Sequence, residues 1–464
     1  MKTKIISDQF NVGISQFTNL FEPDVSNDQH TALKKKSNKI AAKPRPNEVA
    51  EMLVLTSYPP RECGIATYSH DLITVLKKQF GTSFSIKVCA LEAGISSNLY
   101  PDEVKYILDT TNSEKFSKLA QNINQNNQIQ IVLIQHEFGF YHIQEKAFLQ
   151  FLSEVKKPIS IVFHTVLPHP DEMLRAKVRL ISTLCESIIV MTNRSLEILV
   201  GDYGIAPESI SVIAHGTHLV AHVNKDSLKG KYLLKDRKVL TTFGLLSSGK
   251  SIETTLKALP EIIKTSPDVI FLVIGKTHPE VVKKEGEKYR EMLEDTVKTL
   301  GLKDHVRFIN SYLATPDLLE YLQMTDIYLF TTNDPNQAVS GTFAYAMSCA
   351  CPIISTPIPH AKEVLTEDTG IIFDFGNSQQ LATAVKRLLD DETLRNNISL
   401  NTLQKIISTA WENSAIAHAQ VIEKISGKKI MPHYSLPPLN LSHLKKMTTD
   451  VGIIQFSKIN HPDL

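Results

Sequence analysis

The sequence has few of the features that mark a disulfide-stabilised or nucleic-acid-binding protein. Only five of its 464 residues are cysteines, an odd number with no paired C-x-x-C pattern. Neither a disulfide framework nor a zinc site is therefore predicted, and a reducing cytoplasm is the expected location. Fifty Lys and Arg residues face 49 Asp and Glu residues. The formal charge of +1 gives no electrostatic case for a nucleic-acid partner.

Long apolar runs are also absent. No stretch reaches the roughly 20 consecutive apolar residues that a membrane-spanning helix needs, and no apolar segment typical of a secretion signal follows the first lysines. A hydrophobic content of 42% with 21% charged residues is instead typical of a soluble globular protein. Because 464 residues exceed what one hydrophobic core usually organises, we expect two domains with a cleft between them.

The chain divides into five predicted segments. Residues 1–47 are polar and contain the basic run KKKSNK, so we expect a disordered arm. Apolar runs of strand length then alternate with helical patterns, first over 48–223 and again over 239–428, where terminal helices close the series. Residues 224–238 are polar and are predicted to be a linker, and 429–464 form an extension that does not fit the second series.

This alternation predicts an α/β protein with two parallel sheets of Rossmann type. The first series includes strands over 52–56, 131–136 and 159–163, and the second restarts at 239–244. One long charged helix is expected over 279–300. Helical pattern also runs over 392–424, where Trp411 could pack back across the cleft.

The stretch from Asp334 to Leu365 has the pattern of a phosphate-binding turn. Ser340, Gly341 and Thr342 come directly before an apolar helix, and the first N–H groups of a helix attract anions. Pro352 prevents further helix, and a short strand and a proline-rich loop follow. The alternative is an ordinary β-α-β connection with a well-formed helix start.

Polar residues follow several predicted strands. His136 and Glu137 end one strand, His164 follows the next, and His169 lies in the loop beyond it. Because ligands bind at the carboxyl ends of parallel strands, we predict that His136, Glu137 and His169 contact a bound ligand. His164 could instead be a core residue satisfied by backbone groups. No H-E-x-x-H or similar ligand spacing predicts a metal.

Four landmarks in order resemble the retaining GT-B glycosyltransferases of family four, the glycosyl transferases group 1. They are CGIATY at 63–68, FHT at 163–165, FGLLSSGK at 243–250, and SGTFAYAMSCACPIISTPIPHAKEVL at 340–365. The resemblance implies two Rossmann-like domains facing across a cleft, with a sugar donor held mainly by the C-terminal half and an acceptor by the N-terminal half. His136, Glu137 and His169 are then the expected acceptor contacts. The resemblance implies neither cofactor nor metal. It also likens 437–464 to the start of a further helical carbohydrate-active module.

The resemblance also implies roles for single residues. His164 would meet the transferred sugar, and Lys250 would neutralise the diphosphate leaving group, where a cation stabilises the charge that grows as the bond breaks. Gly64 and Gly244 would lie in loops close to the donor. Glu363 would begin the helix after the last loop.

The remaining predicted donor contacts come from the phosphate-binding turn and from two positions where this sequence departs from the family pattern. Amides of Ser340, Gly341 and Thr342 would hold the donor phosphates. The usual Glu-x7-Glu pair is replaced by Gln337 and Tyr345. Gln337 can still bind sugar hydroxyls as a neutral group, whereas Tyr345 is a poor substitute for a carboxylate that holds a ribose.

The arginine expected near the second turn is also missing, because Leu245 occupies its position. Arg61 or Lys276 could supply the lost positive charge. Arg61 follows two prolines that form a rigid turn, and we assign it to donor binding.

Together these features predict a cytoplasmic, metal-independent hexosyltransferase that retains anomeric configuration. Its predicted partners are a nucleoside diphosphate sugar of UDP or GDP type and a carbohydrate acceptor, with neither nucleic acid nor a membrane span. A phosphorylase of the same fold and a non-catalytic carbohydrate-binding protein both stay open. The donor, the acceptor, the product linkage and the oligomeric state cannot be predicted from the sequence.

Overall fold

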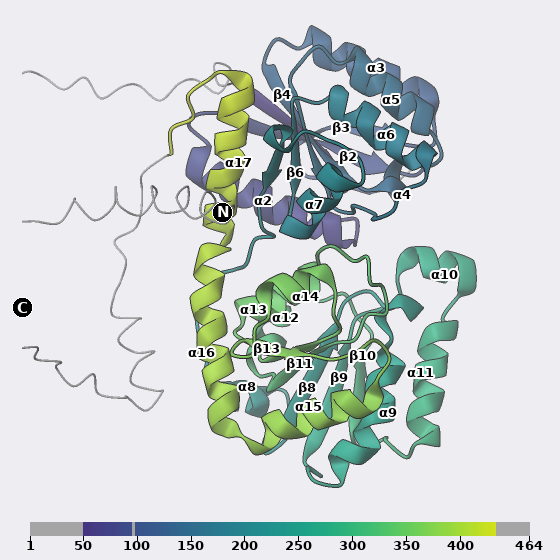
Figure 1. Cartoon of the computed structure of the whole chain (residues 1–464), viewed down its shortest axis with the longest axis vertical. Helices are drawn as coiled ribbons and strands as arrows, with labels where there is room; N and C mark the ends of the chain where they lie inside the picture. The colour runs from purple at the N-terminus through teal and green to yellow at the C-terminus, as the bar shows by residue number, and fades with distance from the viewer. Residues whose placement is uncertain (1–49, 95–97, 433–464) are drawn as a thin grey trace, which may run out of the picture. The chain divides into compact units, whose positions relative to one another are not determined.

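The computed structural model describes residues 50–94 and 98–432. The predicted arm at 1–47 and most of the predicted extension at 429–464 lie outside these residues. The described part contains two parallel β-sheets, each with helices on both faces, as Figure 1 shows. This arrangement confirms the predicted α/β class.

The first sheet has seven strands in the order β3-β2-β1-β4-β5-β6-β7, and all neighbours are parallel. The strands are β1 (Glu51–Thr56), β2 (Ser85–Glu92), β3 (Val104–Asp109), β4 (Ile129–His136), β5 (Ile159–Phe163), β6 (Ser187–Val190) and β7 (Ile210–Val212). The accompanying helices are α2 (Gly64–Phe80), α3 (Ser113–Gln125), α4 (Phe138–Tyr141), α5 (Glu145–Glu154), α6 (Glu172–Thr183) and α7 (Asn193–Gly201).

The second sheet has six parallel strands in the order β10-β9-β8-β11-β12-β13. The strands are β8 (Lys238–Phe243), β9 (Val269–Ile274), β10 (Val306–Ile309), β11 (Ile327–Phe330), β12 (Ile353–Ser355) and β13 (Gly370–Ile372). The helices are α8 (Lys225–Lys231), α9 (Ile252–Ile263), α10 (Pro279–Glu285), α11 (Lys288–Thr299), α12 (Thr315–Gln323), α13 (Gly341–Ser348), α14 (Pro359–Val364), α15 (Ser378–Asp390), α16 (Glu392–Ser408) and α17 (Trp411–Ser426).

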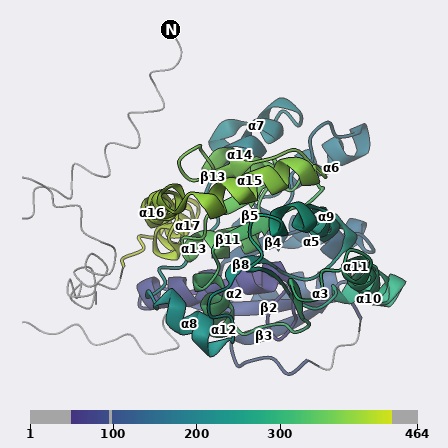
Figure 2. The ribbon, with the colours of Figure 1, turned by 90° about the horizontal axis from the view of Figure 1, so that it is seen from below.

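Burial of both faces explains the apolar strands. In β4, alternate side chains pack either with α3 and α5 or with α2 and α17, which Figure 2 shows on opposite sides of the sheet. Such strands read as continuous apolar runs, because no face meets water. In each sheet the strand order reverses beside the first strand, between β1 and β4 and between β8 and β11. The carboxyl ends of the strands at these points are the usual ligand positions.

Three segments differ from the sequence-based expectation. The helix expected over 279–300 is two helices, because Gly286 has a φ of 69° and ends α10. Residues 224–238, expected as a linker, contain α8, which packs with Leu234, Val239 and Ile270 of the second lobe. The helical pattern over 392–424 breaks between α16 and α17.

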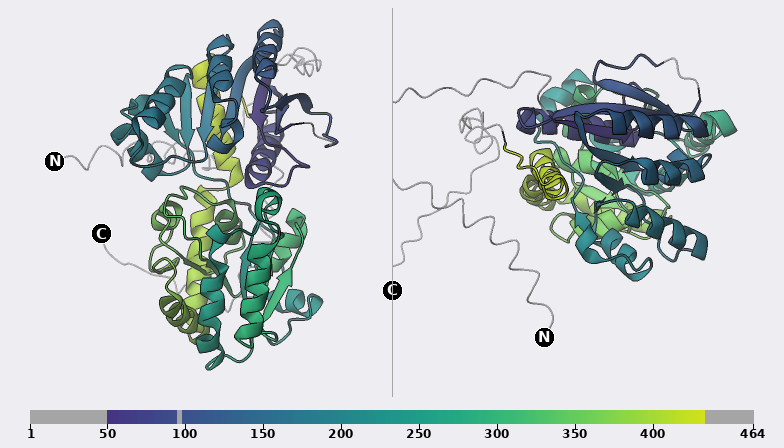
Figure 3. Two further views of the ribbon diagram at one scale, coloured as in Figure 1. Left: turned by 90° about the vertical axis from the view of Figure 1, so that its right-hand side faces the viewer. Right: turned by 90° about the horizontal axis from the view of Figure 1, so that it is seen from above.

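Helix α17 packs on α2 of the first lobe rather than in the second lobe, where its sequence position had placed it. Trp411, the first residue of α17, lies 5.2 Å from Tyr68 between ring centroids, and its backbone N–H donates to Thr217 O at 2.9 Å. Figure 3 shows the helix beside the strands of the first sheet. The predicted packing of Trp411 against the first half of the chain is therefore observed.

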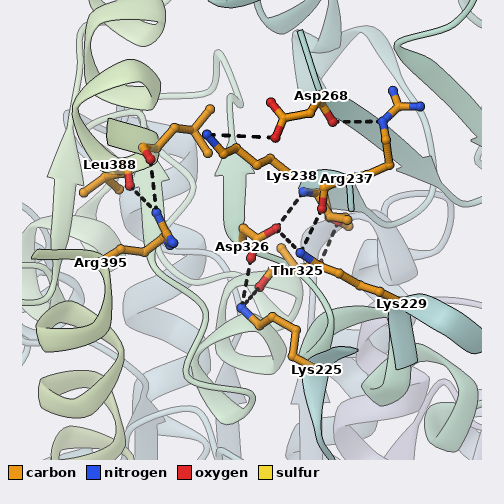
Figure 4. A network of polar contacts seen from close by, with 12 residues as sticks. Lys225, Lys229, Arg237, Lys238, Asp268, Thr325, Asp326, Leu388 and Arg395 are labelled. Carbon is orange, nitrogen blue, oxygen red and sulfur yellow. Dashed lines mark hydrogen bonds and ion pairs between the residues drawn. The ribbon is translucent and has the colours of Figure 1, made fainter. Parts of the chain in front are cut away.

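Asp326 fixes α8 to the second sheet (Figure 4). Its carboxylate is buried and accepts hydrogen bonds from Lys229 Nζ at 2.7 Å and Val239 N at 2.7 Å. Lys225 Nζ lies 3.2 Å from the other carboxylate oxygen. These bonds fix the beginning of β8 and, through it, the turn that follows β8.

Candidate functional site

His164 lies at the carboxyl end of β5. Its backbone N–H donates to His136 O at 3.1 Å, which continues the ladder between β5 and β4. The ring nitrogen Nε2 lies 2.8 Å from Oε1 of Gln135, and the ring meets Tyr68 edge-on with centroids 5.0 Å apart. Burial lowers the pKa of His164 to about 3, so the ring is neutral at pH 7.

His215 connects this strand end to the start of α13. Its Nδ1 lies 2.9 Å from Gly216 O, so Nδ1 carries the proton and Nε2 is an acceptor. The His215 ring lies 5.1 Å from Tyr68 between centroids. A Cβ atom built on Gly341 would lie 3.4 Å from His215 Nε2. Tyr68 and His215 thus join His164 of the first lobe to the phosphate-binding turn of the second.

The phosphate-binding turn has the expected form. Ser340 caps α13, with Oγ accepting from Phe343 N at 3.5 Å, and its own N–H donates to Nδ1 of His360 at 3.4 Å. Gly341 and Thr342 begin the helix, so their N–H groups have no partner within it. The helix start therefore offers free donors next to His215.

Lys250 lies beside the same turn. It ends a short 3₁₀ turn, Ser248–Lys250, after β8. A Cβ atom on Gly244 would lie 3.6 Å from Lys250 Nζ and 3.0 Å from Thr342 Cγ2. No carboxylate pairs with Lys250 among residues 50–94 and 98–432, and Nζ lies 5.6 Å from the Phe330 ring. Burial lowers the pKa of Lys250 to about 8, so an anion bound there would restore a stable positive charge.

Tyr345 is already engaged by the first lobe. Its hydroxyl donates to Asp71 Oδ2 at 2.7 Å, and its ring lies 4.8 Å from that of His218 between centroids. His218 Nε2 lies 3.1 Å from the same oxygen. Burial raises the pKa of Tyr345, so the hydroxyl keeps its proton. Tyr345 was predicted to contact the donor, but its hydroxyl group instead forms a hydrogen bond that links the two lobes.

Gln337 and Gly64 lie on accessible backbone. Gln337 is partly exposed, and its Nε2 donates to Val339 O at 3.4 Å, a long bond that leaves Oε1 free to accept. Gly64 begins α2, which is capped by Cys63 Sγ accepting from Ala66 N at 3.3 Å. A Cβ atom on Gly64 would meet no heavy atom within 4 Å. Both residues leave room for a ligand.

The two cations considered as replacements for the missing arginine differ in their contacts. Arg61 Nη1 donates to Leu91 O at 3.1 Å, and the guanidinium lies 5.7 Å from the Phe140 ring. Lys276 forms an ion pair with Glu62. Burial is the main cause that lowers the pKa of His278, in the loop after β9, and the charge of Arg61 lowers it further. Of the two, Arg61 is free of a carboxylate partner in the described residues.

Glu363 is engaged by the first lobe. Its carboxylate accepts from Arg194 N at 2.8 Å and Asn193 N at 3.1 Å, the first N–H groups of α7. An acidic group at a helix N-terminus is stabilised by those donors and by the helix dipole. Glu363 also lines a cavity of about 430 Å³ together with Pro168 and Asn336. Glu363 lies near the end of α14 (Pro359–Val364) rather than at its beginning, as the resemblance had implied, and its side chain contacts the start of α7.

The three predicted acceptor contacts are not in one place. His136 is 2% exposed and packs among four aromatic rings, those of Phe138, Tyr141, Phe148 and Phe163. Glu137 accepts from Thr165 Oγ1 at 2.6 Å beside His164, and burial raises its pKa. His169 lines a separate polar pocket of about 510 Å³ with Arg175 and Asp202. Of the three side chains, only that of Glu137 bonds to the segment that follows β5, through Thr165.

Sequence reasoning missed three residues of the cluster, namely Tyr68, Asp71 and Gln135. Tyr68 and Asp71 lie one helical turn apart on the face of α2 that meets α13 and His215. Their spacing of three residues indicated that they share one face of a helix, but nothing in the sequence indicated which residues that face contacts. Gln135 precedes His136, and the alternation of β4 directs it to the opposite face, towards His164.

Neither a metal cluster nor a membrane helix is found in the described part of the chain. No group of three or more His, Cys, Asp or Glu side chains there could hold a metal ion. None of the helices described is both long and apolar enough to span a bilayer.

Two parallel Rossmann-type sheets in one chain define the class of GT-B proteins, and solved structures agree. HepE from Anabaena, in complex with UDP and glucose, matches with a TM-score of 0.64 and 18% identity. A glycosyltransferase from Rickettsia africae ESF-5 matches with a TM-score of 0.65 and 14% identity. Each match covers 82% of this chain and 100% of the other. At these identities the likeness establishes the fold, which is GT-B as predicted.

Within this class, residues 224–405 match the model of the family Glycosyl transferases group 1, and the match covers most of the second lobe. Spore coat protein SA of Bacillus subtilis (strain 168) is 27% identical over 205 residues, covering 43% of this chain and 52% of that protein. D-inositol 3-phosphate glycosyltransferase of Corynebacterium diphtheriae is 23% identical over 251 residues, covering 53% and 56%. The chain thus spans about half the length of these relatives.

Proposed function

We propose that this protein is a retaining glycosyltransferase that moves a sugar from a nucleoside diphosphate sugar to a carbohydrate acceptor. The observation that carries the proposal is Lys250, a half-buried cation without a carboxylate partner in the described residues, beside the free N–H groups of α13. Such a pair of features suits a diphosphate. The group 1 match over the same lobe supports sugar transfer.

In this proposal the protein supplies charge and position rather than a covalent intermediate. Lys250 and the free amides of Gly341 and Thr342, with the Ser340 hydroxyl group beside them, stabilise the diphosphate as it leaves, when its charge is greatest. Gln337 binds hydroxyl groups of the transferred sugar. A phosphate oxygen of the donor, rather than a protein base, takes the proton of the acceptor hydroxyl.

The remaining assignments are part of the same proposal. His164 meets the transferred sugar, and Gly64, Arg61 and Gly244 line the donor phosphates. The sugar nucleotide is of UDP or GDP type. HepE, whose structure was solved with UDP and glucose, has the same fold and supports a nucleotide donor.

Turnover by the purified protein tests the proposal. A panel of UDP- and GDP-sugars is incubated with oligosaccharide acceptors, and release of the nucleotide and the anomeric configuration of the product are measured. We expect Lys250→Ala to lower kcat/KM at least 100-fold, whereas Lys264→Ala, at an exposed lysine, stays within twofold of the wild type. Equal rates for Lys250→Ala and the wild type would remove Lys250 from the mechanism.

Metal independence is tested in the same assay. Because the leaving group is assigned to Lys250 and backbone amides, we expect EDTA to leave the rate unchanged. A rate that falls with EDTA and returns with Mg²⁺ or Mn²⁺ would contradict this part of the proposal.

A phosphorylase is the second candidate, because the contacts of Tyr345 suit a reaction that uses no nucleotide. The hydroxyl at the position expected to bind ribose is held by Asp71, and a phosphorylase needs no ribose contact. Release of sugar 1-phosphate that depends on inorganic phosphate, without use of any sugar nucleotide, would establish this function. Binding of oligosaccharide with neither reaction would instead indicate a non-catalytic binding protein.

A further inference from the structure

Gln135 is a buried polar side chain with a single recorded bond. It is 0% exposed, and Oε1 lies 2.8 Å from His164 Nε2. Its Nε2 has no hydrogen-bond partner in the described structure. A buried amide that leaves one end unsatisfied costs stability. The bond to His164 therefore explains why a polar residue occupies this buried position.

The geometry determines which nitrogen of His164 carries the proton. A carbonyl oxygen can only accept a hydrogen bond, so His164 Nε2 must donate to Gln135 Oε1. A neutral imidazole has one N–H, and the other nitrogen, Nδ1, is then an acceptor. Nδ1 has no partner among the described residues, and the His164 side chain is partly exposed.

The surroundings keep His164 neutral and its ring in place. Tyr68 from α2 meets the ring edge-on, and its own hydroxyl is buried without a partner in the described part of the chain. His136 from β4 and His215 from the connection to the second lobe are the titratable groups that oppose a positive charge on His164. Both have pKa values lowered by burial, to about 3 and about 4 respectively, so both are neutral at pH 7.

We propose that Gln135 is a positioning residue that holds His164 in the Nε2–H tautomer, so that Nδ1 accepts a hydrogen bond from a hydroxyl group of the bound sugar. The second half of this statement rests on the proposed function, whereas the first does not. Gln135 acts through His164 and does not itself touch the ligand.

Nitrogen-15 NMR of the imidazole rings tests the tautomer without any assay of activity. The full chain is labelled at histidine, and the His164 signals are assigned by their loss in His164→Asn. We expect Nε2 to be protonated and Nδ1 to be unprotonated in the wild type. A proton on Nδ1 in the wild type, or an unchanged tautomer in Gln135→Leu, would overturn the role of Gln135.

Gln135→Glu provides the matched test by pH. A carboxylate at this position would stabilise the imidazolium and raise the pKa of His164 towards neutrality. Below that raised pKa both nitrogens are protonated, so Nδ1 can no longer accept. We expect turnover of Gln135→Glu to fall about tenfold as the pH decreases from 8 to 5, whereas turnover of the wild type stays flat. Parallel profiles would contradict the proposal.

Control variants separate positioning from simple damage. Gln130→Leu changes a glutamine at the other end of β4 and should leave the tautomer of His164 and the pH profile unchanged. If Gln135 positions His164, Gln135→Leu should lower kcat/KM about tenfold and keep the thermal midpoint of the wild type. A folding defect would instead lower the thermal midpoint of the variant and leave the shape of its pH profile unchanged.

Ligand titration distinguishes the two halves of the proposal. If sugars or sugar nucleotides shift the His164 Nδ1 resonance, a sugar lies against that nitrogen. If no ligand of the panel shifts it while turnover is measured, the sugar contact is overturned although the proposed function stands. If the tautomer is as expected and no ligand is turned over, the proposed function fails and the positioning role remains.

Discussion

Individual side chains of this protein are held in states that serve a bound anion better than the free protein. Lys250 is half-buried, has no acidic partner in the described residues, and keeps its pKa near 8 rather than 10.5. A charged lysine in such a place destabilises the free fold. This destabilisation of the free protein is consistent with a lysine whose counter-ion is part of the ligand.

Lys250→Met should therefore stabilise the ligand-free protein. At pH 7 we expect the free energy of unfolding to increase by roughly 2 kcal/mol, since one pKa unit corresponds to about 1.4 kcal/mol and partial exposure reduces the effect. The folded-state pKa is lowered, so the unfolded chain binds the extra proton between about pH 8 and 10.5. The stability of the wild type thus rises relative to the variant as the pH increases through this range.

Urea unfolding at pH 7 and pH 10 measures this difference. Lys257→Met, at an exposed lysine of α9, is the matched control and should change stability by less than about 0.5 kcal/mol at either pH. A destabilised Lys250→Met protein would show that Lys250 is satisfied in the free state.

At the scale of elements, a close approach between two backbone segments determines the shape of the turns after β8 and β9. Gly275 follows β9 with a φ of 132°, and a Cβ atom there would lie 2.1 Å from Gly244 O in the turn after β8. This approach lets the turns after the two strands pack together beside Lys250. Side chains rarely adopt such a φ, so the position requires glycine for two reasons.

Gly275→Ala should displace the turn after β8. We expect the free energy of unfolding to fall by more than about 2 kcal/mol, because strain and a backbone clash add together. Gly139→Ala, whose Cβ atom would meet nothing within 4 Å, should cost less than about 0.5 kcal/mol. Chemical unfolding of both variants provides the comparison, and similar midpoints would contradict the close approach.

For the whole molecule, two polar contacts between the lobes involve α2. Asp71 is 8% exposed and accepts from Tyr345 of α13, while His218 of the connection lies against the same oxygen. Thr67 Oγ1 lies 2.9 Å from the Tyr312 hydroxyl. Burial raises the pKa of Asp71, but hydrogen bonds from His218, His70 and Tyr345 lower it more, so the carboxylate stays ionised. A buried carboxylate thus joins both lobes to their connection.

Tyr345→Phe should weaken this junction. Removing the hydroxyl leaves a buried carboxylate short of one donor, and we expect a loss of about 1–3 kcal/mol in the free energy of unfolding. Tyr312→Phe removes a more exposed hydroxyl bond and should cost less than about 1 kcal/mol. Thermal unfolding of the two variants compares them directly, and an equal or smaller effect for Tyr345→Phe would show that Asp71 gains nothing from Tyr345.

Most of the fold was predictable because it depends on local patterns. Apolar runs of strand length between helical segments predicted the strands of both sheets, and Ser340 before a small-residue turn predicted the start of α13. The helix breaks at Gly286 and between α16 and α17 were missed. At both places the flanking residues keep a helical pattern, and a single backbone conformation or a packing partner ends the helix.

The sequence by itself determined the order in which strands and helices follow one another, because periodicity, capping residues and turn residues act over a few positions. That Lys250 belongs beside the α13 turn was only an implication of the family resemblance, and the tertiary structure brings the two close together. Tertiary structure alone decided the contacts of the polar groups. Gln135 with His164, Asp71 with Tyr345, and Glu363 with α7 join residues that are 29, 274 and about 170 positions apart. Such pairs form only when separate elements pack together, and burial then fixes which groups are charged.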